Sequence, residues 1–254
     1  QAVVDEVTLL YNEYGVKTFK IIDEMFVLQK RHYATICELL AALPFVDELN
    51  IWAYARVDTV RDNTLPLLRK AGIRWLALGI ESGSEVVRDG AHKSFSQQDI
   101  RNIVASIKAA DINVMGNFIF GLPDDDEAAM QQTLDLAIEL QCEFINFYSA
   151  MAYPGSALYV DALKQGLTLP KTWSGYSQHS YDCQPLPTHH IDAATVLKFR
   201  DNAFHQYFEN LPYLNFVEDK FGLETRQHIE AMASTRLRRQ IVEDAERRIN
   251  VAVS

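Results

Sequence analysis

Residues 79–84, Gly-Ile-Glu-Ser-Gly-Ser, combine two glycines, two hydroxyls and one carboxylate in a short segment. They follow an apolar run, residues 75–78, that predicts a buried strand, so they come where a strand ends and a helix begins. A carboxylate can chelate a ribose diol, and a serine or an open helix N-terminus can donate hydrogen bonds. Glu81 and Ser82 are therefore candidate ligand contacts, although a turn with helix caps uses the same residue types.

Polar side chains also mark the ends of the other strands that the sequence predicts. The carboxyl ends of parallel strands meet at one rim, which is where an α/β barrel binds its ligands. A rim that carries acids, one arginine and glycines suits a small zwitterionic ligand with a ribose and an aromatic base. The further candidates, in chain order, are Asp23, Glu24, Arg56, Asn117, Gly121, Asn146 and Tyr148, with Tyr153 and Ser156 just beyond the last strand.

Helical and strand patterns alternate five times, and this alternation predicts an α/β fold with a parallel sheet. The apolar patterns predict strands at 19–23, 49–55, 74–80, 113–120 and 143–150, with two of them apolar on both faces. They predict helices at 3–14, 31–43, 65–71, 96–110, 124–140 and 156–166. A closed barrel of this kind uses eight strands. We therefore expect residues 1–166 to form a partial (β/α) barrel of about five to six strands.

Residues 167–254 break this alternation and form a predicted C-terminal extension. The pattern indicates a long ordered loop at 167–190, a helix at 191–211 and one further helix at 223–250. Trp173, Tyr176 and Tyr181 in the loop suit either packing or a lid over the barrel. The histidines of the loop have no spacing typical of a metal site, so surface positions are favoured over metal binding.

Composition narrows the functional classes. The chain has 254 residues and a formal net charge of −10, which argues against a nucleic-acid scaffold. No apolar run approaches the roughly 20 residues of a membrane span. Cys37, Cys142 and Cys183 are sparse and lack metal-ligand spacing, which indicates a reducing, cytoplasmic compartment. The first two are expected in the core, whereas the position of Cys183 in a polar loop leaves both an exposed and a buried side chain open.

Taken in order, these segments resemble the core of a radical S-adenosylmethionine (SAM) enzyme. The likeness is to the branch that often carries an N-terminal cobalamin-binding domain, and it covers about residues 1–166. No single motif is decisive, but their order and spacing are specific. The matching pieces are residues 19–26, 55–58, 79–84, Lys93, 117–123 and 153–156.

The resemblance implies roles by position. Asp23 and Glu24 match the segment that receives the amino group of SAM, and Arg56 matches the position near its carboxylate. Glu81 and Ser82 match the motif that contacts the ribose. Residues 117–124 match the motif G-x-I-x-G-x-x-E, in which Ile119 and Gly121 pack on the adenine, with Asn117 for the first glycine and Asp124 for the glutamate. Asn146, Tyr148, Tyr153 and Ser156 are expected to face the substrate.

One departure from the family pattern is large. The family binds a 4Fe-4S cluster through a Cys-x3-Cys-x2-Cys loop, and this sequence has no such motif. We therefore expect a catalytic-core fragment, inactive alone, of an enzyme that uses SAM, a 4Fe-4S cluster and possibly cobalamin. That enzyme would cleave SAM to a 5′-deoxyadenosyl radical for hydrogen abstraction or methyl transfer on a small-molecule substrate, with flavodoxin or ferredoxin as the reductant. The oligomeric state is left open.

Two other interpretations remain. The first is a non-catalytic relative that lost the cluster and binds a nucleoside-like ligand or a partner protein. The second is an ordinary barrel hydrolase or lyase that uses Asp23, Glu24 and Glu81 as acid and base. The second interpretation predicts a carboxylate with a shifted pKa near the rim.

Overall fold

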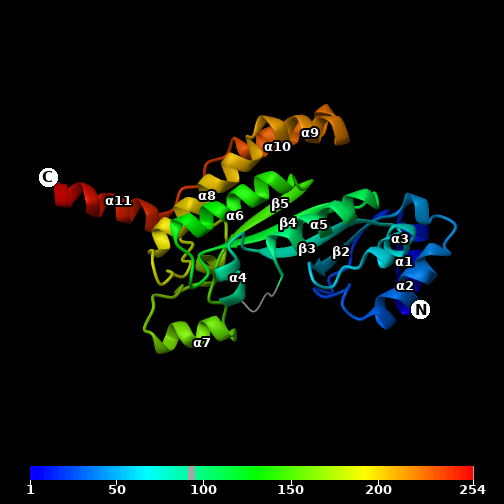
Figure 1. Cartoon of the computed structure of the whole chain (residues 1–254), viewed down its shortest axis with the longest axis horizontal. Helices are drawn as coiled ribbons and strands as arrows, with labels where there is room; N and C mark the ends of the chain where they lie inside the picture. The colour runs from blue at the N-terminus through cyan, green and yellow to red at the C-terminus, as the bar shows by residue number, and fades with distance from the viewer. Residues whose placement is uncertain (91–94, 254) are drawn as a thin grey trace. The chain divides into compact units, whose positions relative to one another are not determined.

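The computed structural model describes residues 1–90 and 95–253 (Figure 1). Five parallel strands form a partial barrel in the order β1-β2-β3-β4-β5, which confirms the predicted α/β class. The strands are β1 (Thr18–Lys20), β2 (Asn50–Arg56), β3 (Ile73–Glu81), β4 (Asn113–Phe120) and β5 (Phe144–Ser149). The helices that alternate with them are α1 (Ala2–Tyr14), α2 (Lys30–Ala41), α3 (Leu65–Lys70), α4 (Glu85–Gly90), α5 (Gln97–Ala109), α6 (Glu127–Leu140) and α7 (Ala157–Lys164).

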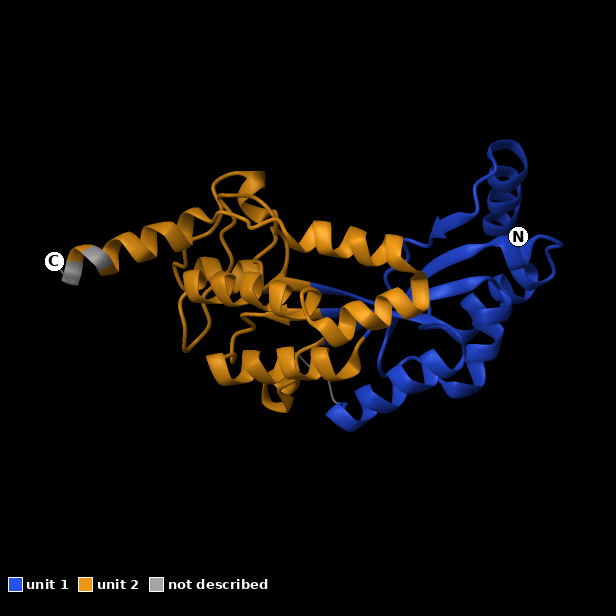
Figure 2. Cartoon of the chain, turned by 90° about the horizontal axis from the view of Figure 1, so that it is seen from above, with its two compact units in different colours: residues 1–80, 95–117, 142–146 blue, residues 81–94, 118–141, 147–254 orange. Residues whose placement is uncertain are grey.

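The chain divides into two compact units, which are described separately (Figure 2). Unit 1 comprises residues 1–80, 95–117 and 142–146, and unit 2 comprises residues 81–94, 118–141 and 147–254. The first unit holds β1, β2 and most of β3, and the second holds the last residues of β4 and β5.

Local signals end α1 and begin α5 close to where the sequence predicts. Gly15 closes α1 with a left-handed backbone (φ 66°), a conformation that glycine adopts without steric cost. Ser96 and Asp99 form a reciprocal capping box at the start of α5. Residues of β2 pair in parallel with β1 and β3, and the stacked rings of Trp52 and Trp75 (centroids 4.2 Å apart) join two of these strands.

Unit 2 is built on aromatic packing and capped helices. Phe147 lies 5.0 Å from Phe120 and 5.7 Å from Phe118, centroid to centroid, within a buried aromatic cluster. Asp126 caps α6 by accepting a hydrogen bond from the backbone N–H of Ala129. The burial of apolar side chains such as these aromatic rings is the main contribution to the folding stability of the unit.

The strands differ in two ways from the prediction. In β4, buried residues alternate with half-buried ones, so only one face of that strand is fully covered, not both. Strand β1 ends at Lys20, three residues earlier than expected, although the N–H of Ile21 still bonds to the carbonyl of Trp52. Asp23 and Glu24 consequently lie in an exposed turn after the strand.

The C-terminal part corrects the prediction of one helix over 223–250. Unit 2 continues through a short 3-10 turn at Trp173–Tyr176 into α8 (Ala193–Phe208), α9 (Leu211–Phe221), α10 (Leu223–Ala233) and α11 (Gln240–Val253). Helix α9 ends at Gly222, whose φ is 90°. Helices α10 and α11 are separate because Arg239, which is 3% exposed, turns inward to pair with Asp201.

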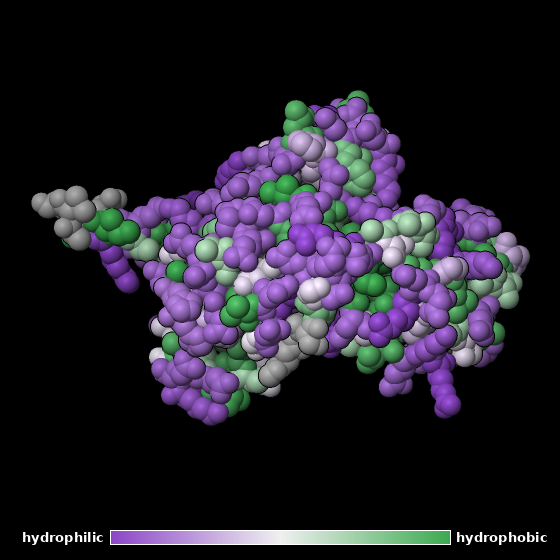
Figure 3. Space-filling view, in the orientation of Figure 1, coloured by the Kyte–Doolittle hydropathy of each residue, from purple (hydrophilic) through white to green (hydrophobic). Residues whose placement is uncertain are grey.

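The face in Figure 3 is largely hydrophilic, with apolar side chains scattered over it. Among the helices of the described residues, none has the length and apolar character that crossing a membrane requires. Cys37 and Cys142 are buried as expected, and Cys183, whose exposure the sequence left open, packs against Met151 and Leu197 and is 1% exposed.

Candidate cofactor-binding site

The turn after β3 holds Glu81 in an unusual backbone conformation. Its φ of 69° places a non-glycine residue in the left-handed region, which is disfavoured by sterics. Two other described non-glycine residues share this property, Asp111 and Gln141, and both directly follow helices, where left-handed residues are common. Glu81 instead terminates a strand, and its side chain is half-buried.

Buried polar groups within unit 2 hold this turn. The hydroxyls of Ser82 and Thr133 are 3.1 Å apart, and the same threonine oxygen accepts the N–H of Gly83 at 2.8 Å. The fully buried Arg88 donates from Nη1 to the carbonyl of Ser82 at 2.6 Å. The Ser82 side chain thus stabilises the turn, and its contact with a ribose stays a prediction.

The turn after β4 is held by Asp125. Its Oδ2 accepts the N–H groups of Gly121 (2.9 Å) and Leu122 (3.0 Å), and the side chain is fully buried. Burial raises the pKa of Asp125 to about 6, although those two hydrogen bonds oppose the shift. Its Oδ1 has no hydrogen-bond partner among the described residues.

Gly121 is required at this turn by geometry. Its φ is 82°, and a Cβ atom there would lie 2.5 Å from a methyl carbon of Val196 on α8. Both the backbone conformation and the close approach of α8 therefore exclude a side chain. Ile119, two residues earlier, packs partly buried against a cluster of Val87, Leu122, Ala129 and Ala150 in the same unit.

The candidates in unit 1 are held by surface contacts. Asp23 accepts the N–H of Met25 at 3.0 Å, and Glu24 is exposed. Arg56 forms a bidentate pair with Asp58, from Nε at 2.9 Å and from Nη2 at 2.7 Å. The carboxylate of Asp58 thus occupies two of the guanidinium nitrogens, which leaves Nη1 for a further acceptor.

The structure brings two predicted residues together in unit 1. The side-chain amide of Asn146 donates to Oδ1 of Asn117 at 2.9 Å, so strands β4 and β5 present these residues on one face. In unit 2, the exposed Tyr153 stacks on Tyr176 (centroids 5.9 Å apart), and Ser156 caps α7. Tyr148 is also exposed.

The cysteines do not fit an iron–sulfur cluster. Desolvation by burial raises the pKa of Cys37 and of Cys142 to about 12 and that of Cys183 to about 11, whereas a cluster requires thiolates. All three are free, and no group of three or more histidine, cysteine or acidic residues suited to a metal occurs in the described part of the chain. The cysteines of the described part of the chain are therefore not suited to hold a cluster.

Sequence reasoning missed the residues that hold the turns. Thr133, Arg88 and Asp125 act from positions whose burial no local pattern reveals. A signal existed for Asp125, because three consecutive aspartates follow Gly121-Leu122-Pro123 and only one can face the turn. Lys93, part of the resemblance, lies outside the described residues.

Comparison with known proteins agrees with this geometry. No protein-family model matches the chain. A solved structure of the radical SAM methyltransferase TsrM from Kitasatospora setae, with cobalamin and a 4Fe-4S cluster bound, matches with a TM-score of 0.59 and 18% identity over 67% of this chain and 32% of that one. The chain has the fold of the radical SAM enzymes. The resemblance predicted from the sequence is thus confirmed.

The sequence relatives of this chain include a methyltransferase and a cyclase. An uncharacterized methyltransferase of Pyrococcus horikoshii is 26% identical over 177 residues, covering 70% of this chain and 38% of the relative. An anaerobic magnesium-protoporphyrin IX monomethyl ester cyclase of Rubrivivax gelatinosus is 27% identical over 223 residues, covering 86% of this chain and 39% of the relative. The chain spans about two fifths of the length of these two relatives.

Proposed function

We propose that this chain is the SAM-binding part of a radical SAM enzyme that acts by hydrogen abstraction or methyl transfer. The backbone of Glu81 carries the proposal. A non-glycine residue in the left-handed region costs about 1–3 kcal/mol, and such residues cluster at ligand-binding turns. The packing in unit 2 maintains this conformation at the position where the resemblance places the ribose-binding carboxylate.

Each unit contributes its own set of residues to the proposal. In unit 2, Glu81 would accept hydrogen bonds from the ribose hydroxyls, and Ile119 with the backbone of Gly121 would pack on the adenine. The fit is supported by Gly121, which presents bare backbone at φ 82°. Bound SAM supplies the reacting group, and the protein orients it.

In unit 1, Asp23 and Glu24 would accept hydrogen bonds from the ammonium of the methionine part. Arg56 would donate from Nη1 to the carboxylate, since Asp58 occupies Nε and Nη2. Any cluster would be ligated by cysteines other than Cys37, Cys142 and Cys183. The same proposal includes cobalamin and an electron donor such as flavodoxin or ferredoxin. It also includes a small-molecule substrate that Asn146, Tyr148 and Tyr153 would contact.

The hydrolase interpretation is not supported by the carboxylate that it would need. Asp125 is the described carboxylate with a clearly raised pKa, but its side chain is fully buried and holds the β4 turn. A general base must reach the proton that it removes. We therefore assign Asp125 a structural role.

Two Glu81 variants test the proposal. Glu81→Gln should weaken SAM binding about tenfold in isothermal titration calorimetry, because a charge-assisted hydrogen bond becomes a neutral one. Glu81→Gly removes the side chain at a backbone conformation that glycine accepts, so it should lose at least as much affinity as Glu81→Gln, without loss of stability. The matched control is Glu127→Gln, which removes an exposed charge in the same unit. Wild-type affinity in both Glu81 variants would refute the ribose assignment.

A further inference from the structure

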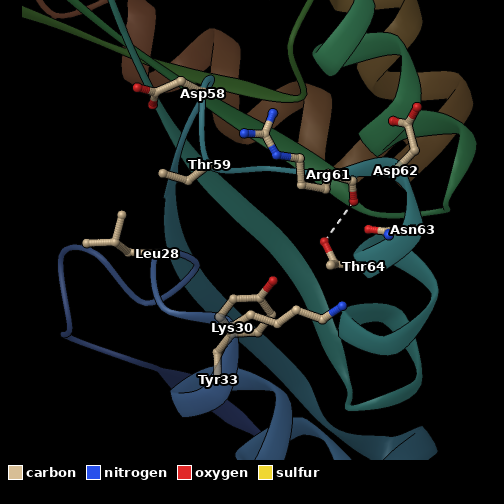
Figure 4. Close-up of a pocket in the computed structure, with 9 residues that line it drawn as sticks. All are labelled: Leu28, Lys30, Tyr33, Asp58, Thr59, Arg61, Asp62, Asn63 and Thr64. Atoms are coloured by element: carbon tan, nitrogen blue, oxygen red, sulfur yellow. Dashed lines mark hydrogen bonds between the residues drawn. The ribbon is translucent and has the colours of Figure 1, made fainter.

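A pocket lies wholly within unit 1, beside the Arg56–Asp58 pair. It has a volume of about 750 Å³ and lies between the start of α2 and the segment that joins β2 to α3 (Figure 4). The start of α2 contributes Lys30 and Tyr33, and the other wall contributes residues 58–59 and 61–64. None of its lining residues is among those for which a role in SAM binding is proposed.

Two of the side chains that line this pocket are cations without ion-pair partners. Lys30 and Arg61 are exposed, and no carboxylate within 4.0 Å of either is found in the described part of the chain. Two other arginines of unit 1, Arg56 and Arg69, each pair with an aspartate in this chain of net charge −10. Two unpaired cations at one concave surface therefore favour an anionic ligand.

The acids of the pocket do not neutralise these cations. Both oxygens of Asp58 are bonded to Arg56, so its charge is already compensated. The Asp62 carboxylate is directed away from Lys30 and Tyr33 in Figure 4, although Asp62 also lines the pocket. With Asp58 compensated by Arg56, the two lining cations outnumber this one carboxylate, so the lining keeps a net positive charge.

Neutral groups add hydrogen-bond donors to the same walls. Tyr33 contributes a phenol, and Asn63 contributes a side-chain amide. Lys30 is also the first residue of α2, a twelve-residue helix whose N-cap, Gln29, makes no side-chain capping bond. The positive end of that helix adds to the attraction for an anion.

We propose that this pocket binds an oxyanion group, a phosphate or a carboxylate, through Lys30 and Arg61. The planar guanidinium suits bidentate contact with two oxygens, and the ammonium adds a point charge. This proposal is independent of the SAM site, because the pocket lining includes neither the unit 2 residues nor Asp23, Glu24 and Arg56 of unit 1, to which SAM binding is assigned.

Titration of the 254-residue chain with inorganic phosphate, and separately with succinate, tests it at constant ionic strength. Isothermal titration calorimetry should show saturable binding of one of the two anions. Tighter phosphate binding assigns the site to phosphoryl groups, and tighter succinate binding assigns it to carboxylates. Absence of saturable binding of either anion would overturn the proposal.

Variants locate the binding. Arg61→Gln and Lys30→Gln should each raise the dissociation constant at least fivefold. Arg61→Lys keeps the positive charge but loses the planar guanidinium that contacts two oxygens, so it should lose part of the affinity. Lys70→Gln is the matched control, since it removes an exposed cation of unit 1 outside the pocket. Equal weakening by all variants would show non-specific charge attraction and would overturn the proposal. Because the altered side chains are exposed, circular dichroism should show an unchanged fold.

Discussion

The strand ends of unit 2 are held from inside, whereas those of unit 1 are held at the surface. In unit 2, Thr133 and Asp125 accept backbone N–H groups of the β3 and β4 turns from buried positions. The side-chain amide of Gln178 similarly bonds both the N–H and the carbonyl of Ser149 at the end of β5. In unit 1, the corresponding segments carry the exposed Asp23 and the partly exposed Arg56–Asp58 pair.

This difference separates two ways of preparing a binding surface. Buried hydrogen bonds fix a backbone, because each one left unmade would cost about 1–3 kcal/mol. Exposed ion pairs contribute little to stability and leave their charges available to a ligand. The turns of unit 2 are thus suited to shape recognition, and the segments of unit 1 are suited to charge recognition.

The largest effect that would test this comparison is expected at Gly83. A Cβ atom at this position would collide with the backbone carbonyl of Gln132 and lie 2.7 Å from Cα of Thr133, and backbone cannot rotate away. Gly83→Ala should therefore lower the free energy of unfolding by about 3 kcal/mol in urea denaturation. Gly155→Ala is the control, since it adds backbone strain at φ 90° with no atom within 4 Å. If the two variants lose equal stability, packing does not hold the β3 turn.

An intermediate effect is expected from the ionisation of Asp125. Its folded pKa of about 6 lies above its ordinary value of 3.8, so the folded state binds this proton more tightly than the unfolded state does. Its contribution to stability is therefore complete below about pH 4 and is lost as the pH rises through about 6. Compared with Asp125→Asn, which keeps an acceptor oxygen, the wild type should lose about 2 kcal/mol of unfolding free energy across this range. Parallel pH profiles of the two proteins would contradict the buried carboxylate.

The smallest effect on stability is expected at Arg56. The side chains of Arg56 and Asp58 are 31% and 43% exposed, so water screens their pair. Arg56→Ala should change the free energy of unfolding by about 0.5 kcal/mol or less, with Asp58→Ala as the matched partner deletion. The same Arg56 variant should weaken SAM binding, because a carboxylate loses its charged donor. A stability loss as large as that of Gly83→Ala would erase the distinction between the units.

Elements with strong local signals were predictable from the sequence. Strand β4 has the predicted bounds, and Gly15 and Ser96 end α1 and begin α5 as expected. The sequence was insufficient where distant residues decide. The separation of α10 from α11 depends on Arg239 reaching Asp201, 38 residues earlier in the chain, and Cys183 is buried by contacts with Met151 and Leu197.

The sequence by itself determined the order of the five strands and of most helices between them, because apolar spacing separates helices from strands and their alternation requires a parallel sheet. It also placed Glu81, Gly121 and Arg56 at strand ends. It did not predict α4, α9 or the separation of α10 from α11. Only the tertiary structure decided among the three aspartates after the β4 turn. Asp124 is exposed beside His189, Asp126 caps α6, and Asp125 is buried under the turn. Three identical residues take three roles because their side chains face different surroundings. Asp125 faces the buried β4 turn and Asp126 faces the first turn of α6, whereas Asp124 faces the exposed His189, 65 residues further along the chain.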